Sequence, residues 1–313
     1  MRHASCARQR GAALLTAMII VTLVATLSAA MVWQQWRAVQ VEAAERARAQ
    51  SAWILSGALD FAKLILREDF RSGRVTALTE PWATPLAESR LSTFLSVDKA
   101  NTDDGPEAFL SGNITDAQAR YNLNNLVNQG KVDPAELATL ERLCQTVGIE
   151  SGIAARIASG LRDAGDTTSA SAPLKPATVA QLTWLGIDEA SVQALSPFVV
   201  LLPYGVPLNV NTAPSEVLVA AVKGMDGATA EHLIQVRQRT PFKTPGDFTG
   251  QIPALAPFTA KLEVRSSYFE VRGRLRLVDH VLVERSLLQR IPPNGQSNVL
   301  QRQRVSSLEQ VGG

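Results

Sequence analysis

The stretch from Arg10 to Trp36, RGAALLTAMIIVTLVATLSAAMVWQQW, decides how this chain is organised. Beyond Gly11 it carries no charge, and about 20 apolar residues in a helix are enough to cross a bilayer. Met1–Gly11, in front of it, contains three arginines and no acidic residue, a pattern that favours a cytoplasmic amino end. We therefore expect a transmembrane helix over 12–36, with the remaining chain on the opposite side.

Three kinds of amino-terminal segment could explain this stretch. A secretory signal peptide would be cut near Ala25–Ala30, but no Pro or Gly interrupts the chain between Ala12 and Ser56. An uncleaved signal anchor is the second alternative. The third is a type IV prepilin leader, which is cut between Gly11 and Ala12 before a helix that stays in the protein. The unbroken helix argues against the first, and the rest of the chain must decide between the other two.

The helix is predicted to continue beyond the membrane to about Arg67. Apolar or small residues recur every three or four positions, which is typical of one helix face, and charges fill the other face. We expect this half of the helix to pack on a soluble domain, and Trp33 and Trp36 to anchor it at the membrane interface. The stripe consists of Val32, Trp36, Val39, Ala43, Ala47, Gln50, Ile54, Gly57, Phe61 and Ile65.

Composition excludes several classes of protein. Lys and Arg number 31 and Asp and Glu 29, so removing the three arginines of the leader leaves 28 against 29, with no polyanion-binding signature. Cys6 lies in the leader and Cys144 on an apolar stripe, so we expect no disulfide and a buried, inert thiol. The histidines His3, His232 and His280 show no metal-ligand spacing. We expect no enzyme and no catalytic residue.

The remaining pattern predicts an α+β fold: a long helix packed on a small antiparallel, pilin-like sheet, with an inserted all-α domain. Strand-like segments at 108–114 and 120–123 precede a helical region, and period-two alternation returns after Pro257. The inserted domain is predicted to be of a SAM-like or helix-hairpin-helix-like kind. The expected parts are a leader over 1–11, a transmembrane helix over 12–36, a core over 37–130, an inserted domain over 131–256, strands over 257–291 and a disordered tail over 292–313.

An internal repeat supports the helical region. A glycine, an apolar residue and an acid recur at intervals of 38 residues, starting at Gly148, Gly186 and Gly224. Nine residues beyond each glycine lies an apolar residue: Ile157, Leu195 and Leu233. This predicts helix pairs, in which one helix ends at the glycine and the acid begins the next.

At this point the chain resembles the GspK family (general secretion pathway protein K), the minor pseudopilins of the type II secretion system. The resemblance covers nearly the whole chain. Besides the leader, it rests on PWATPL at 81–86, ITDAQARYNLNNLV at 114–127, LNVNTAPSEVL at 208–218, Pro241-Phe242, and SSYFEVRGRLRL at 266–277.

The resemblance implies a non-enzymatic subunit of a periplasmic pseudopilus that helps export folded proteins across the outer membrane. Prepilin peptidase would cut between Gly11 and Ala12, and Ala12 would be N-methylated. The chain would sit in the bacterial inner membrane with its bulk in the periplasm. Its implied partners are the minor pseudopilins GspI and GspJ, and beyond them GspH and the major pseudopilin GspG. They would meet the helix face formed by Trp36, Val39, Ala43, Ala47 and Ile54.

Thr16 occupies the fifth position of the implied mature chain, where pilin-like subunits usually carry Glu; its absence is typical of the GspK family. A carboxylate in lipid is tolerated mainly when a partner charge neutralises it. A subunit with no neighbour above it can dispense with the acid. The bulk of an inserted domain would also obstruct stacking, so the resemblance implies a place at the pseudopilus tip.

The family tends to carry a calcium-binding stretch where this chain reads SGLRDAGDTT at 159–168. Asp163 and Asp166 are the only acidic residues in this stretch, and Arg162 lies directly before them. Calcium needs about six to eight oxygen ligands, several of them carboxylates. We therefore expect a solvated loop, no metal site and no cofactor, with Asp163 and Asp166 as weak calcium candidates.

A rival interpretation is a membrane-anchored, helix-hairpin-helix nucleic-acid-binding protein. Residues 209–248 resemble such modules, in which backbone N–H groups at a helix N-terminus bind phosphate. Here the turn reads Gly224-Met225-Asp226-Gly227, and the carboxylate of Asp226 would repel phosphate. The neighbouring cations Lys223, Arg237, Arg239 and Lys243 are balanced by Asp226, Glu231 and Asp247. We therefore expect no nucleic-acid binding.

Overall fold

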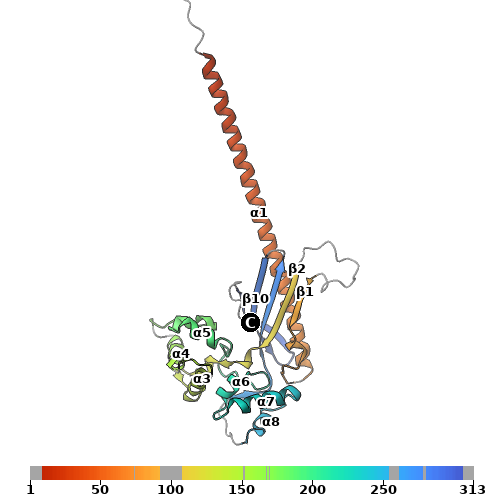
Figure 1. Cartoon of the computed structure of the whole chain (residues 1–313), viewed down its shortest axis with the longest axis vertical. Helices are drawn as coiled ribbons and strands as arrows, with labels where there is room; N and C mark the ends of the chain where they lie inside the picture. The colour runs from red at the N-terminus through yellow and green to blue at the C-terminus, as the bar shows by residue number, and fades with distance from the viewer. Residues whose placement is uncertain are drawn as a thin grey trace, which may run out of the picture. The chain divides into compact units, whose positions relative to one another are not determined.

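The computed structural model describes residues 9–73, 75–91, 108–150, 152–166, 168, 170–253, 261–277 and 280–305. The chain divides into two compact units, Met1–Ser56 and Gly57–Gly313. The first unit is formed by helix α1 (Gln9–Arg71), drawn red to orange in Figure 1, whose last turns belong to the second unit. The predicted long helix is therefore confirmed, four residues longer at its end than expected.

The first unit is helical throughout its described residues and has a strongly apolar stretch. The mean hydropathy of its most apolar window is 2.3, and the helix is long enough to cross a membrane. Its hydroxyl groups bond to the helix itself: the Oγ1 atom of Thr16 donates to the carbonyls of Ala12 (3.0 Å) and Ala13 (2.9 Å). Such internal bonding lets a threonine lie in lipid without an unsatisfied polar group.

The second unit contains a five-stranded antiparallel sheet in the order β1-β2-β9-β10-β11. Its strands are β1 (Leu86–Arg90), β2 (Ala108–Asp116), β9 (Tyr268–Leu277), β10 (His280–Ile291) and β11 (Gln296–Val305). One face carries Ile114, Phe269 and Leu288 against Leu59, Ala62 and Leu66 of α1. Trp82 of the 3-10 turn η1 (Pro81–Ala83) closes this core edge-on to Phe269, with ring centroids 5.4 Å apart.

Of the predicted stripe, Ile65 at its end packs against the sheet, but the buried helix face there is a different one. Leu59, Ala62 and Leu66 are buried, whereas Phe61 is 45% exposed and Gly57 borders open space. Ala62 and Phe61 differ by one position, which is about 100° around a helix. Both faces carry apolar residues at helical spacing, so periodicity alone could not tell which face meets the sheet.

The predicted disordered tail over 292–313 is wrong for residues 296–305, which form β11. Nine of its residues pair with β10 through a turn at 292–295. The polar composition of this segment suggested disorder, but an edge strand needs only backbone pairing on one side. Residues 306–313 lie outside the described residues. Strand β1 also lies ahead of 108–114, the first strand-like segment expected from the sequence.

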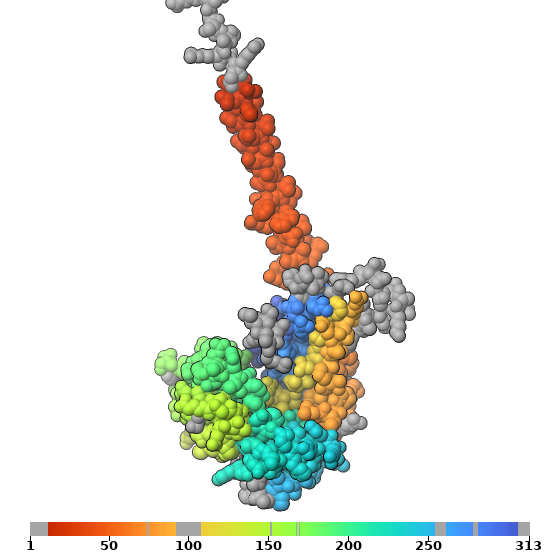
Figure 2. Space-filling view, in the orientation of Figure 1, coloured from red at the N-terminus to blue at the C-terminus, as the bar shows by residue number. Residues whose placement is uncertain are grey.

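The helical region is inserted between two neighbouring strands. Strand β2 ends at Asp116, β9 begins at Tyr268, and Asp116 lies opposite Phe269 in the sheet. The chain therefore leaves the sheet and returns to it at nearly the same point. In Figures 1 and 2 the helices gather in a green and a cyan group. They are α3 (Pro134–Thr146), α4 (Gly152–Ala164), the 3-10 helix η4 (Val179–Leu185), α5 (Glu189–Leu195), α6 (Ser215–Ala221), α7 (Gly227–Arg239) and α8 (Pro245–Gly250).

The inserted region is mainly helical, but the expectation of an all-α domain needs correction. Three short strand pairs tie its loops together, because buried backbone between helices must pair with something. They are β3 (Tyr121–Asn122) with β6 (Val199–Val200), β4 (Val127–Asn128) with β5 (Lys131–Val132), and β7 (Leu208–Asn209) with β8 (Leu262–Glu263).

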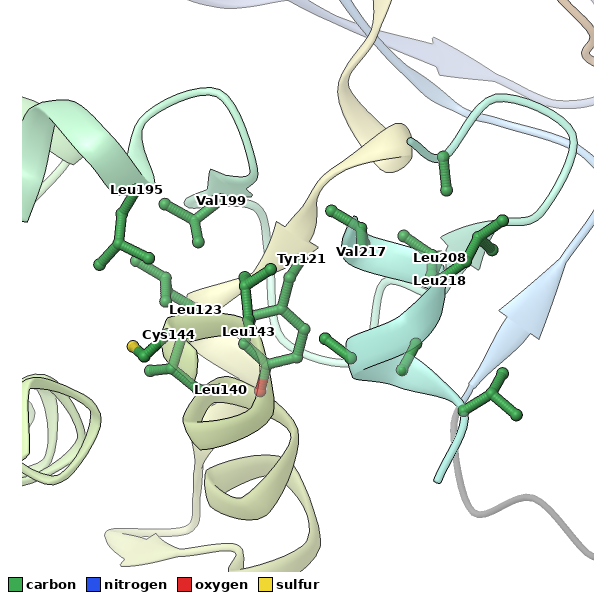
Figure 3. Close-up of a cluster of buried hydrophobic side chains, with 14 of the residues drawn as sticks. Tyr121, Leu123, Leu140, Leu143, Cys144, Leu195, Val199, Leu208, Val217 and Leu218 are labelled. Atoms are coloured by element: carbon green, nitrogen blue, oxygen red, sulfur yellow. The ribbon is translucent and has the colours of Figure 1, made fainter. Parts of the chain in front are cut away.

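One apolar core serves all the helices of the insert. Figure 3 shows Leu140, Leu143 and Cys144 of α3 converging with Leu195 of α5 and Leu218 of α6. Cys144 is fully buried, which confirms the prediction, and burial raises the pKa of its thiol to about 11. A thiol with so high a pKa is almost wholly protonated at neutral pH and is therefore a poor nucleophile.

The glycine repeat is confirmed in its local geometry. Gly148, Gly186 and Gly224 all have positive φ angles, of 76°, 78° and 85°. Asp188 and Asp226 cap the following helices, α5 and α7, by accepting hydrogen bonds from backbone N–H groups. The apolar residues nine positions later, Ile157, Leu195 and Leu233, are buried in the core of the insert.

A pair of glycines tests the role of this backbone conformation. A Cβ atom would meet nothing within 4 Å at either Gly186 or Gly227, but only Gly186 has a positive φ. We expect Gly186→Ala to destabilise the chain by about 1–2 kcal/mol, because a left-handed conformation strains an L-residue. Gly227→Ala, in the first turn of α7, should be neutral or slightly stabilising. Denaturant unfolding of both variants would check this, and equal midpoints would contradict it.

Candidate functional site

The predicted partner face of α1 lies open in the first unit. Trp36 is 55% exposed and Val39 61% exposed, and Ala43 is exposed as well. Ala47 and Ile54 are half-buried. The rings of Trp33 and Trp36 stack with centroids 5.4 Å apart. Exposed apolar side chains at this spacing are what an amphipathic helix presents to another helix.

The predicted cleavage site lies at the start of the same helix. Gly11 and Ala12 are helical, in the first turns of α1. Residues 1–8 of the predicted leader lie outside the described residues. The hydroxyl of Thr16 donates to carbonyls of its own helix, as described above. Cleavage between Gly11 and Ala12, and methylation of Ala12, stay predictions.

A buried carboxylate, which sequence reasoning did not single out, joins the inserted region to the sheet. Asp116, the last residue of β2, is only 4% exposed. Its Oδ2 atom accepts hydrogen bonds from Thr212 Oγ1 (2.6 Å), Ser266 Oγ (2.6 Å) and Asn209 Nδ2 (2.9 Å). Its Oδ1 atom accepts one from the backbone N–H of Gln118 (2.8 Å). We call these residues the Asp116 joint.

A buried arginine continues this network to α1. The Nη2 atom of Arg290 donates to the Ser266 carbonyl (2.7 Å), and its Nη1 atom to Asp69 Oδ2 (2.8 Å) and the Leu66 carbonyl (3.2 Å). The guanidinium also lies 4.7 Å from the ring centroid of Phe269. The two charges, on Arg290 and Asp69, are both nearly buried, and each is satisfied by the other.

Burial sets the electrostatics of the Asp116 joint. Desolvation raises the pKa of the Asp116 carboxyl above its ordinary value of 3.8, and the four hydrogen bonds that it accepts oppose this rise. All four donors belong to residues of the joint itself. The Asp116 carboxylate therefore connects the end of β2 to the insert and to the segment just before β9.

Asn122 and Asn125, which we call the clamp, bind the segment after β6 through their side chains. Asn122 accepts from the N–H of Leu202 (2.9 Å) and donates to the carbonyl of Pro203 (2.8 Å). Asn125 does the same with Gly205 (2.9 Å) and Val206 (3.1 Å). The cavity beside these residues measures about 30 Å³, which is room for about one water molecule rather than a ligand.

The residues of the joint and the clamp belong to the sequence motifs that suggested a family, and comparisons with known proteins agree. Residues 119–204 and 208–269 match two family models, both described as type II secretion system (T2SS), protein K. Protein K of Pseudomonas aeruginosa is 32% identical over 90% of this chain and 89% of its own length. The chain belongs to the type II secretion system protein K family. It is thus a minor pseudopilin, a structural component of the secretion machinery.

Other relatives and a solved structure give the same result. Type II secretion system protein K of Pectobacterium carotovorum is 29% identical, over 90% of this chain and 92% of its own. The crystal structure of the GspK-GspI-GspJ complex from enterotoxigenic Escherichia coli contains a chain with a TM-score of 0.67 and 21% identity. That match covers 84% of this chain and 99% of the other, and it shows that the fold is shared.

The weak calcium candidates of this protein K are both engaged with neighbours. Asp163 pairs with Arg162 at 2.8 Å, and Asp166 accepts hydrogen bonds from the backbone and hydroxyl of Thr168. Within the described ranges, no group of three or more His, Cys, Asp or Glu is placed to hold a metal. The expectation that no calcium binds stays a prediction.

The geometry of the helix-hairpin-helix-like segment does not favour phosphate binding. Asp226 accepts a hydrogen bond from the N–H of Thr229 (2.8 Å), so a carboxylate already occupies the N-terminus of α7. Hydrogen bonds from Thr229 lower the pKa of Asp226, which is therefore charged at neutral pH. Arg237 is buried and donates to the Val210 carbonyl (2.6 Å), which removes one of the four cations from the surface.

The Asp116 joint generates a pH-dependent prediction. Asp116→Asn should destabilise the chain by about 1–3 kcal/mol, because an amide N–H would then face the donors that the carboxylate accepted. A pKa raised on folding adds stability below the unfolded value and loses it as pH rises through the folded value. The penalty of Asp116→Asn should therefore be largest near pH 4 and shrink as the pH rises.

Denaturant unfolding at several pH values checks this prediction. Asp163→Asn is the control, since Asp163 is exposed on α4 and its loss should change stability by no more than about 0.5 kcal/mol. A penalty at Asp116 that grows with pH would contradict a raised pKa. A penalty no larger than that at Asp163 would contradict the role of the joint.

Proposed function

We propose that this minor pseudopilin is processed at Gly11-Ala12 and assembles at the tip of a pseudopilus with GspI-like and GspJ-like subunits. Its anchor would lie in the inner membrane with the amino end cytoplasmic and the bulk periplasmic. The solved relative is a complex of GspK with GspI and GspJ, which supports these partners. GspH and the major pseudopilin GspG would follow lower in the same assembly.

The observation that carries the proposal is a set of exposed apolar side chains along α1. In the second unit the sheet takes Leu59, Ala62 and Leu66, and it leaves Leu64 50% exposed. In the first unit Val39 and Ala43, beyond the expected membrane span, are exposed too. Surface of this kind, at helical spacing, fits packing against helices of neighbouring subunits.

Two further features support a place at the tip. Thr16 supplies no carboxylate to pair with the amino terminus of a neighbour, and its hydroxyl is satisfied within α1. The insert adds about 150 residues between β2 and β9, a volume that subunits stacked within a filament would have to accommodate. A subunit at the tip needs no carboxylate for a neighbour above it, and its insert does not have to fit between stacked subunits.

Two alanines on α1 test the partner face. Ala43 and Ala38 are both exposed, but five positions separate them, which is about 140° around the helix. We expect Ala43→Glu to weaken co-purification with the GspI-like and GspJ-like subunits by about tenfold or more, because it puts a charge into an apolar helix contact. Ala38→Glu, the same change on another face, should leave the complex intact. Equal effects of both variants would contradict the assignment of this face.

Processing of the leader is tested on the membrane form. We expect its amino-terminal sequence to begin at Ala12, with an N-methyl group seen by mass spectrometry. A start near Ala29–Met31 would indicate cleavage by signal peptidase. An intact Met1 would indicate an ordinary signal anchor, and either result would refute processing as a prepilin.

A further inference from the structure

The sheet has a second face, opposite to the one that packs on α1, which we call the outer face. Side chains alternate along a strand. Because Phe269 and Val271 of β9 face the core with α1, the alternate residues Arg272, Arg274 and Arg276 lie on the outer face. Arg285 of β10 lies there too, directly opposite Arg272. Four arginines are thus gathered on two neighbouring strands.

Two glutamates are shared among the arginines of this face. Glu88 of β1 contacts Arg276 at 2.8 Å and Arg274 at 3.6 Å. Glu270 contacts Arg120 at 2.7 Å and Arg285 at 2.9 Å. The hydrogen bond from Arg276 lowers the pKa of Glu88, so this carboxylate stays charged at neutral pH. Four arginines share these two glutamates, and Arg272 and Arg90, which lies opposite Phe109 on the same face, add further positive charge.

Arg272, in the middle of the face, lacks an anion. Among the described residues it forms no ion pair, and its cross-strand neighbours are Arg285 on one side and Asn113 on the other. Like charges directly opposite each other on a sheet are destabilising. The free chain therefore bears a repulsion here that an anionic partner would relieve.

The neighbouring arginines are held in place before any partner arrives. The guanidinium of Arg276 lies 4.0 Å from the ring centroid of Phe109, which is opposite it on β2. Side chains of Arg274, Arg276 and Arg285 nevertheless keep 37%, 39% and 43% of their surface exposed. Pre-ordered and still accessible guanidinium groups lose little rotamer entropy when they bind a carboxylate.

We propose that the outer face binds an extended acidic segment of a partner protein. Arg272, Arg274 and Arg276 follow one another at about 7 Å along β9, the same period at which alternate side chains of an extended peptide repeat. Carboxylates at alternate positions of such a segment would meet the three guanidinium groups in turn. A protein partner fits better than nucleic acid, because the chain without its leader has no excess of basic residues, whereas polyanion binding draws on such an excess.

The test uses the full chain in non-ionic detergent and a fluorescent peptide of alternating Glu and Thr. We expect anisotropy to show binding that weakens with salt, and the double variant Arg272→Gln/Arg274→Gln to bind about tenfold more weakly. The matched control Arg239→Gln/Lys243→Gln removes two charges near α7 and should bind like the wild type. A peptide with Gln in place of Glu should not bind.

Several results would overturn the proposal. These are equal loss of binding in both double variants, equal binding of the Gln peptide, or oligothymidylate binding to the outer face more tightly than the acidic peptide. Thermal unfolding of Arg272→Gln alone adds a second readout. We expect its melting temperature to equal or exceed that of the wild type, because one member of a like-charge pair is gone. A drop of several degrees would show that Arg272 has a structural role, and that too would refute the proposal.

Discussion

At the end of β2 the Asp116 carboxylate accepts hydrogen bonds from four residues. Asn209 and Thr212 lie just before α6, Ser266 lies just before β9, and Gln118 follows β2. These donors come from parts of the chain up to 150 residues away from it. A buried carboxylate is tolerated only when it is fully hydrogen-bonded. The joint therefore forms only when the sheet and the insert are both in place, and this makes their assembly mutually dependent.

The position of the joint explains how so large an insertion is tolerated. The insert leaves the sheet after Asp116 and returns before Tyr268, at adjacent ends of neighbouring antiparallel strands. The cost of closing such a loop grows only slowly with its length, provided that its ends stay together. Asp116 and Ser266 hold these two ends, and Arg290 ties Ser266 to Asp69 of α1.

Features that local chemistry decides could be predicted, and features that depend on distant partners could not. Gly186 needs only its own positive φ to end a helix, so its role was readable from the sequence. The stripe through Phe61 failed as a sheet contact because a second apolar face, through Ala62, runs beside it. Strand β11 escaped prediction because its polar residues are held by backbone pairing to β10. Asp116 looked like any loop acid, since its partners lie far away in the sequence.

The charge on the outer face of the sheet also depends on partners that are distant in the sequence. Near the joint, Tyr268 and Leu287 are covered by Val200 and Leu202 of the insert, an ordinary apolar contact. Farther along β9, the outward positions are occupied by Arg272 and Arg274 instead of apolar residues. An apolar segment packed on them would bury their guanidinium groups with too few carboxylates to neutralise the charge. The insert cannot extend over this region without that cost, so the charged part of the face stays accessible. An overall charge near zero conceals this separation, because it arises only when β9 and β10 pair and bring Arg272 opposite Arg285.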